Sequence, residues 1–394
     1  MPETAARPAP TGATPPGRGL PVTVRPVRSP ADRAAFLDVP YDLYAGDPYF
    51  VPPLRFDQKQ ILDPKKNPFF EHGAMELFLA DRGGAVVGRV AAIENGQHLA
   101  KYADGNGFFG FFDTVEDYAV AEALLDAAAG WLRARGLTGV RGPANPTMND
   151  VAGLLVARFD RPPSILLPYN YPYYQDFLER WGFRRAMTMW AFYVHEAYMD
   201  TERMARGAAI VERRHPGIRI RPLDPERFEE DVVTAMRIYN EAWAANWGHV
   251  PYTDREAIHL AKELKPVIEE DLFLFAELDG EPIAFATSIP NYNRALKELP
   301  RGRLRPAGIA RAFAAVKSGS IYEVRMALMG VIPAYRNAGL DSFLIHHTIV
   351  NGRGVGYQAA ELSWVLDTNK PMINGLEKLG ATRDKEYAMF EAEL

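Results

Sequence analysis

The chain has 394 residues, of which 47% are apolar and 24% are charged, a balance typical of soluble globular proteins. Its length suits two or three domains. The formal net charge is -5 and the basic residues are spread along the chain, which argues against nucleic acid as the main partner. There is no cysteine, so disulfides, thiolate metal sites and cysteine nucleophiles are excluded.

Residues 1–20 are rich in Pro, Ala, Thr and Gly. Such a composition cannot bury a core, so it predicts a disordered tail. The segment lacks the apolar stretch of a signal peptide, and no apolar run in the chain approaches the roughly 20 residues that cross a bilayer. We therefore expect a cytoplasmic protein without a membrane partner.

The rest of the chain repeats itself once, at a nearly constant spacing. The matched features are Arg25-Pro26 with Arg221-Pro222, Gly83 with Gly280, and Asn170 with Asn369. Both copies read as strand, helices, hairpin, strand, helix, strand, helix and strand. Hairpins mixed with βαβ units predict an α/β fold in which each copy is a twisted mixed sheet flanked by helices. The alternative is two unrelated α/β domains with similar turns.

These copies give predicted domains at 21–197 and 217–394, with the boundary in the polar stretch 198–216. Each copy carries one insertion. The first spans 142–168, between a strand and its closing helix. The second, 291–319, is basic and contains a predicted helix around Ala307 to Val316.

One segment of the second copy has the pattern of an anion site. It begins as a strand at Ile321, turns at 333–339 and continues as an amphipathic helix. Backbone N–H groups and the positive end of a helix converge at such a turn. Gly339 lets the backbone approach a phosphate, because it has no Cβ. Asp341 in the first helical turn should weaken phosphate binding unless its carboxylate points away.

The loop Arg336-Asn337-Ala338-Gly339-Leu340-Asp341 resembles the Q/R-x-x-G-x-G/A loop of the GNAT N-acetyltransferase superfamily, which binds the pyrophosphate of acetyl-coenzyme A. A following strand, Asn369 and a closing helix come in the order of that family. The resemblance implies a binding site for acetyl-CoA, or another acyl-CoA, as co-substrate. Its residues would be Val331, Arg336, Asn337, Ala338, Gly339, Leu340 and Asn369.

The first copy has lost this loop, since residues 118–121 at the corresponding place read Tyr-Ala-Val-Ala. Asp113, Glu116 and Asp117 add negative charge just before it. The first copy is therefore predicted to be a degenerate GNAT-like domain that binds no coenzyme A. Its segments 107–113, 142–163 and 168–174 resemble an uncharacterised bacterial family of tandem-GNAT proteins.

Acetyl transfer needs a general base for the attacking amine and an acid for the leaving thiolate. Glu323 lies on the strand before the loop, where many GNAT enzymes keep a catalytic glutamate. The alternative is a surface ion pair with Arg325 on the same strand face. GNAT enzymes commonly place a tyrosine acid where this chain has Leu376, which cannot donate a proton.

The end of the first helix of the second copy is expected to roof the acceptor site, as in GNAT folds. Thr253 and Glu256 form a capping box that starts the next helix. The residues predicted to contact the acceptor are Trp247, His249, Tyr252, Asn145 and Asn149. Trp243 is expected to pack in the core. Asx-turns are the alternative for the two asparagines.

The predicted function is the transfer of an acyl group, expected to be acetyl, from coenzyme A to an amine of a small molecule or peptide. No metal is expected, because the adjacent His346 and His347 diverge on a helix. The alternative is a pseudoenzyme that binds acyl-CoA or serves as a scaffold, which Leu376 and Asp341 favour. Aminoacyl transfer from tRNA is disfavoured by the acidic net charge. Monomer and homodimer both remain open.

Overall fold

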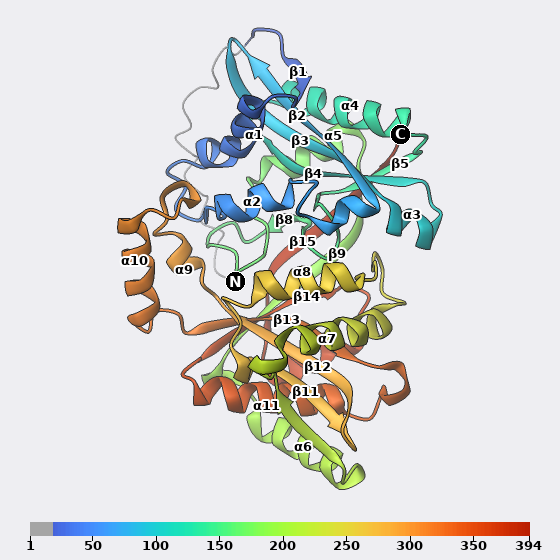
Figure 1. The fold of residues 1–394 in the computed structure, drawn as a ribbon, viewed down its shortest axis with the longest axis vertical. Helices are drawn as coiled ribbons and strands as arrows, with labels where there is room; N and C mark the ends of the chain where they lie inside the picture. Colours follow the sequence, from blue (N-terminus) through green and yellow to red (C-terminus); the bar gives the residue numbers. More distant parts are fainter. Residues whose placement is uncertain (1–18) are drawn as a thin grey trace, which may run out of the picture.

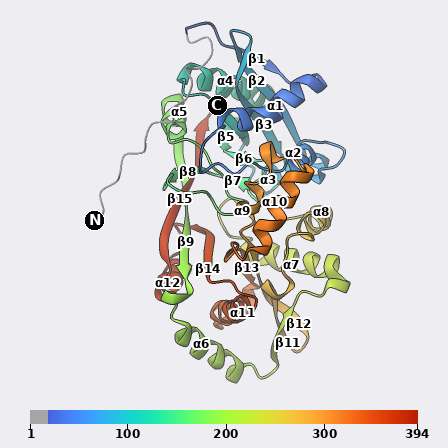
Figure 2. The same cartoon turned by 90° about the vertical axis from the view of Figure 1, so that its left-hand side faces the viewer.

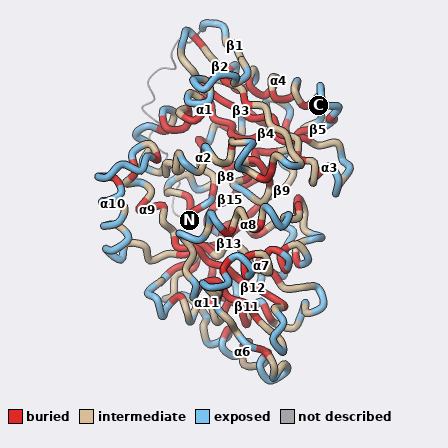
Figure 3. The backbone as a smooth tube through the Cα atoms, in the orientation of Figure 1, coloured by how far each residue is buried: buried red, intermediate tan, exposed pale blue. Residues whose placement is uncertain are grey.

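A computed structural model describes residues 19–394. The tail predicted over 1–20 therefore lies outside the described residues, except for its last two. Within residues 19–394, one 13-stranded sheet runs through both copies, and helices cover its two faces (Figure 1). Figure 3 shows that the buried residues follow these strands.

The first copy has its elements in the predicted order. Its strands are β1 (Thr23–Pro26), β2 (Gly73–Arg82), β3 (Ala85–Asn95), β4 (Asn106–Thr114), β5 (Gly139–Gly142), β6 (Ala144–Asn145), β7 (Val151–Ala152), β8 (Leu154–Ala157) and β9 (Arg184–His195). Its helices are α1 (Pro30–Leu43), α2 (Arg55–Ile61), α3 (Gly96–Tyr102), α4 (Tyr118–Ala134) and α5 (Tyr173–Trp181). Strands β6 to β8 lie in the first insertion.

The second copy repeats this order. Its strands are β10 (Ile218–Pro222), β11 (Phe273–Leu278), β12 (Glu281–Pro290), β13 (Glu323–Val331), β14 (Ala359–Leu366) and β15 (Thr382–Glu393). Its helices are α7 (Phe228–Trp243), α8 (Asp254–Leu264), α9 (Asn293–Leu296), α10 (Pro306–Lys317), α11 (Leu340–Gly354) and α12 (Lys370–Leu379). The helix predicted in the second insertion is confirmed as α10, and the capping box at Thr253 is confirmed at the start of α8.

The two copies exchange their last strands. The sheet order is β1-β2-β3-β4-β5-β15-β9-β14-β13-β12-β11-β10. Strand β15 of the second copy thus pairs with β5 of the first, and β9 of the first pairs with β14 of the second. Because each closing strand fills the sheet of the other copy, the two sheets predicted from the sequence form one continuous sheet.

The polar stretch 198–216 contains the helix α6 (Thr201–Arg214), which packs on α11. Its apolar residues Met204, Ala208 and Val211 recur every three or four positions, so they share one buried face. The segment predicted as the domain boundary therefore covers the helix that follows the anion loop.

Strand β11 shows how one sheet is buried on both faces. Phe273 and Phe275 pack with α7 and α8, whereas Leu274 and Ala276 pack with α11. Successive side chains of a strand point to opposite faces, so a continuous apolar run is required where helices cover both. The strands that carry the candidate site therefore have one face covered by α7 and α8 and the other covered by α11.

Candidate functional site

The predicted strand, turn and helix of the anion loop are present. Strand β13 ends at Val331, and α11 begins after Gly339, whose φ of 84° lies in the left-handed region that suits glycine. No side chain caps the N-terminus of α11 in the part of the chain that the structure describes. The first N–H groups of a helix have no intrahelical partner, so they suit the oxygens of a phosphate.

The other residues predicted to bind the cofactor line or support this loop. The guanidinium of Arg336 donates to the carbonyl of Ala242 at 2.7 Å, so it fastens the loop to α7. Asn337 has a φ of 65°, Ala338 donates its N–H to Tyr335, and Leu340 is buried. The loop is therefore held in shape by its neighbours, and its contact with coenzyme A stays a prediction.

Two further residues bear on the phosphate site. Asn369 caps α12, since its side chain accepts from the N–H of Met372 at 3.3 Å. Asp341 is exposed in the first turn of α11. A carboxylate there adds a negative charge at the end of the helix where the phosphates are expected.

The parallel strands β13 and β14 stop pairing beside this loop. Their ladder runs from Glu323 opposite Ala359 to Met326 opposite Leu362, although both strands continue further. A β-bulge between β12 and β13 also leaves Ala327 out of the register with β12. Main-chain groups beyond Met326 are therefore available on the β14 side to pair with an extended ligand, as an added strand would.

The corresponding helix of the first copy has an intramolecular anion at its N-terminus. The carboxylate of Asp117 caps α4 by accepting from the N–H of Ala119 at 3.0 Å. The buried Arg82 donates to the same carboxylate at 2.6 Å. A protein carboxylate thus holds the position that a phosphate would take, which supports the prediction that the first copy binds no coenzyme A.

Tyrosines close the end of β4 in the first copy. The carbonyl of Thr114 accepts from the hydroxyls of Tyr173 at 2.8 Å and Tyr174 at 3.2 Å. The buried Tyr44 donates to the hydroxyl of Tyr174 at 3.3 Å. Tyr173 and Tyr174 thus occupy the end of β4, the strand of the first copy that corresponds to β13.

Glu323 accepts a hydrogen bond from the hydroxyl of Tyr193 at 3.1 Å and another from Asn291 at 3.4 Å. Arg325 instead donates to the hydroxyl of Ser363 and to the carbonyl of Ile165, both at 3.0 Å. The alternative interpretation of Glu323 as an ion pair with Arg325 is therefore wrong. Burial, with help from the nearby Glu323, raises the pKa of Tyr193, so this hydroxyl remains a donor.

Charged side chains from three strands and a tyrosine from a fourth gather on the same face. The register places Glu361 beside Arg325 on one side and Tyr193 on the other. Burial raises the pKa of Glu361 and lowers the pKa of Lys385, since each charge is moved out of water. Sequence reasoning missed Glu361, Tyr193 and Lys385. The available signal was a glutamate inside the apolar strand AAELSWVL.

Several polar atoms around this cluster are buried without a hydrogen-bond partner among residues 19–394. They are the hydroxyl of Tyr387, the indole N–H of Trp364 and the side-chain oxygen of Asn291. Buried polar groups are nearly always paired in native proteins, so this arrangement indicates room for polar groups of a ligand or for water. Tyr387 and Trp364 were not singled out in the sequence.

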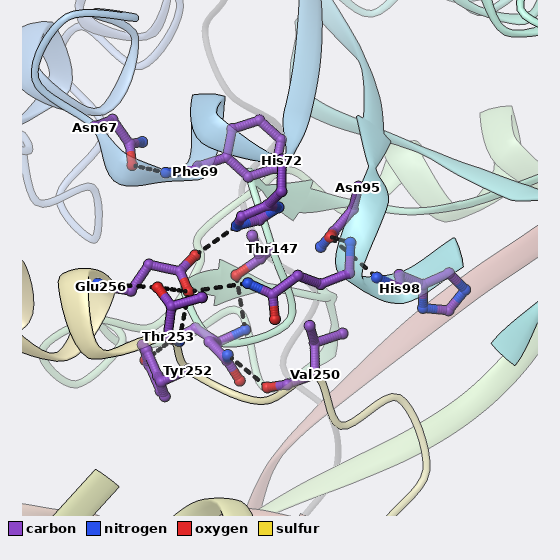
Figure 4. Close-up of polar contacts among 12 residues, drawn as sticks. Asn67, Phe69, His72, Asn95, His98, Thr147, Val250, Tyr252, Thr253 and Glu256 are labelled. Atoms are coloured by element: carbon purple, nitrogen blue, oxygen red, sulfur yellow. Dashed lines mark hydrogen bonds and ion pairs between the residues drawn. The ribbon is translucent and has the colours of Figure 1, made fainter. Parts of the chain in front are cut away.

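Four of the five residues predicted to contact the acceptor lie where the two copies meet. Lys101 donates to the ring of His249 at 3.0 Å and to its carbonyl at 2.9 Å. Asn149 donates to the carbonyl of Val250 at 2.9 Å. Figure 4 shows the adjoining contact, in which His72 bonds to Glu256 at 2.9 Å.

Trp247 and Tyr252 also pack at this junction. Arg141 lies over the ring of Trp247, 5.0 Å from its centroid. Tyr252 donates to the carbonyl of Asn149 at 3.3 Å, and Asn145 accepts from the N–H of Phe111 at 2.6 Å. Trp247 and Tyr252 thus join the copies, whereas Asn145 bonds within the first copy. Their contact with an acceptor remains a prediction. Trp243 packs in the core as expected.

The junction should lose stability in mild acid because of His249. Burial, with the nearby charge of Lys101, lowers the pKa of His249 to about 4, whereas an unfolded histidine titrates near 6.5. The neutral ring of His249 therefore contributes its full share to the free energy of unfolding above pH 6.5. This contribution decreases as the pH falls toward 4, by at most about 3 kcal/mol. Thermal unfolding across this range should show a shallower decline for His249→Asn. Parallel curves for both proteins would contradict the assignment.

Among residues 19–394, no group of three His, Asp or Glu side chains could hold a metal ion. Within the same residues, no helix has the length and apolar character needed to cross a bilayer.

The comparisons with known proteins agree with this geometry. The model of the Acetyltransferase (GNAT) family matches residues 232–381. A protein of Caulobacter vibrioides (strain NA1000 / CB15N) named bacterial ceramide synthase is 37% identical over 383 residues, 95% of this chain and 98% of its own. Protein YghO of Escherichia coli (strain K12) is 30% identical over 375 residues, 94% of this chain and 95% of its own.

Among solved structures, a tandem GNAT protein from the clavulanic acid biosynthesis pathway matches with a TM-score of 0.56. It covers 95% of this chain and 98% of its own at 13% identity, which shows a shared fold alone. The predicted superfamily and fold class are thereby confirmed. The chain belongs to the GNAT acetyltransferase family and is built from two GNAT copies in tandem.

Proposed function

We propose that the chain is an N-acyltransferase that moves a long acyl group from coenzyme A to the amine of a long-chain acceptor. The observation that carries the proposal is the place of Glu323. It lies on the strand that leads to the uncapped end of α11, and it accepts a hydrogen bond from Tyr193. A carboxylate base next to a protonated hydroxyl suits the two proton transfers of acyl transfer.

In the proposed reaction, the amine nitrogen forms a bond to the thioester carbonyl carbon and the carbon–sulfur bond breaks. Glu323 accepts the proton of the amine, directly or through water. Tyr193 gives its proton to the leaving thiolate and recovers one from Glu323. Tyr193 would thus replace the tyrosine missing at Leu376, although it comes from the closing strand of the first copy.

The nature of the acyl group and acceptor is proposed from the relative named bacterial ceramide synthase. A ceramide is an amide of a long-chain acid and a long-chain amino alcohol. Identity of 37% across 95% of this chain supports related substrates. The proposal therefore replaces acetyl, expected from the resemblance alone, by a long acyl chain.

The first copy is proposed to shape the acceptor side. Its insertion supplies the carbonyl of Ile165 to Arg325, and its Arg161 forms an ion pair with the buried Asp384. These contacts cover the face that carries Glu323. They support a division of labour in which the second copy holds the donor and the first encloses the acceptor.

The test is to incubate the full chain with acetyl-, octanoyl- and palmitoyl-CoA and either a long-chain amino alcohol or ethanolamine. Each buried methylene contributes about 0.8 kcal/mol, so palmitoyl transfer to the long-chain amine should exceed acetyl transfer by at least about tenfold. Amide product and released thiol are measured together. Acetyl transfer alone would overturn the long-chain assignment. Tight acyl-CoA binding without any amide would support the pseudoenzyme.

A further inference from the structure

Helix α10, in the second insertion, exposes large apolar side chains. Ile309, Phe313 and Val316 are exposed by 47%, 62% and 41%, and Leu304 just before the helix by 59%. The three helical positions are four and three residues apart, so they form one stripe. A contiguous apolar surface on a soluble protein is commonly an interaction site.

The face of α10 that contacts the protein is turned by about 100° from the stripe, and its residues are small. Gly308 is buried, and Ala312 and Ala315 are half-buried. A Cβ on Gly308 would lie 3.2 Å from the side chain of Leu299, so the helix packs closely there. The large apolar residues therefore face outward, because the close packing around Gly308 leaves no space for them on the side that contacts the protein.

The insertion is also anchored, which fixes the direction of the stripe. Arg301 forms ion pairs with Asp38 at 2.6 Å and Asp42 at 2.5 Å in α1. Asn293 donates to the carbonyl of Pro163 at 2.8 Å. Figure 2 shows α10 on the outside of the molecule, over the elements that hold it.

Basic side chains border the apolar stripe. Arg303, Arg305 and Lys317 are exposed, and within residues 19–394 neither Arg303 nor Arg305 takes part in an ion pair. Arg311 is already paired with Glu298 at 3.2 Å. An outward apolar stripe with unpaired arginines at its end is the pattern of a helix that lies in the headgroup region of an anionic membrane.

We propose that α10 and residues 303–305 dock the protein on the surface of a membrane that contains anionic phospholipid. Charge complementarity selects this partner, and the stripe would enter the boundary between headgroups and acyl chains. The inference replaces the expectation of no membrane partner and does not rest on acyl transfer. The insertion begins at Asn291, which donates to Glu323, so the docking helix is linked along the chain to the candidate active site.

The experiment measures sedimentation of the full chain with vesicles of phosphatidylcholine alone or mixed with phosphatidylglycerol. The wild-type chain should bind the mixed vesicles, and added salt should weaken this binding. Ile309→Ser/Phe313→Ser should weaken it by at least about tenfold, because two apolar side chains no longer leave water. Arg303→Ala/Arg305→Ala should weaken it by about fivefold for each arginine.

The controls change equally exposed residues elsewhere. Val350→Ser, at a position 51% exposed on α11, and Arg203→Ala/Arg206→Ala on α6 should bind as the wild type does. Equal binding to both vesicle types, or equal loss in the control variants, would overturn the proposal. So would a dimer without vesicle binding that Ile309→Ser/Phe313→Ser dissociates, because the stripe would then join two copies of the chain.

Discussion

Glu323→Gln is expected to lower the turnover of acyl transfer by roughly 10²–10⁴-fold while acyl-CoA affinity stays nearly unchanged. The amide keeps the shape of the side chain and can still accept a hydrogen bond from Tyr193, but it cannot take a proton. Single-turnover rates and calorimetric titration with acyl-CoA separate the two effects. Hydrolysis of acyl-CoA without an amine is a second readout, since a base that activates an amine can also activate water.

The matched control is Glu281→Gln, which removes the same charge from an exposed position at the start of β12. It should leave the rate unchanged. Tyr193→Phe keeps the ring and removes the hydroxyl, so it should slow the release of the thiolate without weakening acyl-CoA binding. An unchanged rate in Glu323→Gln would remove Glu323 from the mechanism, and the buried Glu361 would become the candidate base.

Local signals explain what the sequence predicted correctly. Asp279-Gly280 predicts the hairpin of β11 and β12 because both residues accept a positive φ, and Asp279 has a φ of 53°. Thr253 and Glu256 predict the start of α8 because the side chain of each accepts a hydrogen bond from the backbone N–H of the other. The loop before α11 is predicted because a strand pattern, a glycine and a helix pattern follow one another closely in the sequence. Each of these depends on a few neighbouring residues.

The exchange of β9 and β15 could not be predicted in this way. The central parts of both strands, MTMWAFYV in β9 and YAMF in β15, are nearly continuous apolar runs, and such a run fits either neighbouring sheet. The pairing of residues more than 160 positions apart leaves no trace in the local pattern. Tyr193 and Lys385 were missed for the same reason, because only the exchanged strands bring them beside Glu323 and Glu361.

The residues near the end of α7 show a related limit. In a single domain, Trp247 and His249 would end a helix in an open loop, which favours a binding role. In this chain the first copy covers that loop. Its Lys101 bonds to His249, and its Arg141 packs on the ring of Trp247. The resemblance to GNAT folds predicted where this loop lies, but it did not predict that the first copy packs against it.

Gly339→Glu is expected to weaken acyl-CoA binding by at least roughly 100-fold in a chain that otherwise binds one acyl-CoA. A side chain there takes the space of a phosphate at the end of α11, and its carboxylate repels the ligand. The variant also meets a structural cost, since a Cβ at this position would lie 3.1 Å from Val211 and a φ of 84° strains other residues. Calorimetric titration gives affinity and stoichiometry together.

The background Val211→Ala makes room for the new side chain and separates these effects. In that background, Gly339→Ala carries the same backbone strain and a Cβ but no charge, so it should bind within about tenfold of its parent. Gly339→Glu in the same background should not bind. Equal affinity of the two would mean that the loop is not the phosphate site. A stoichiometry of two would show that the first copy also binds acyl-CoA, which Asp117 at the end of α4 should prevent.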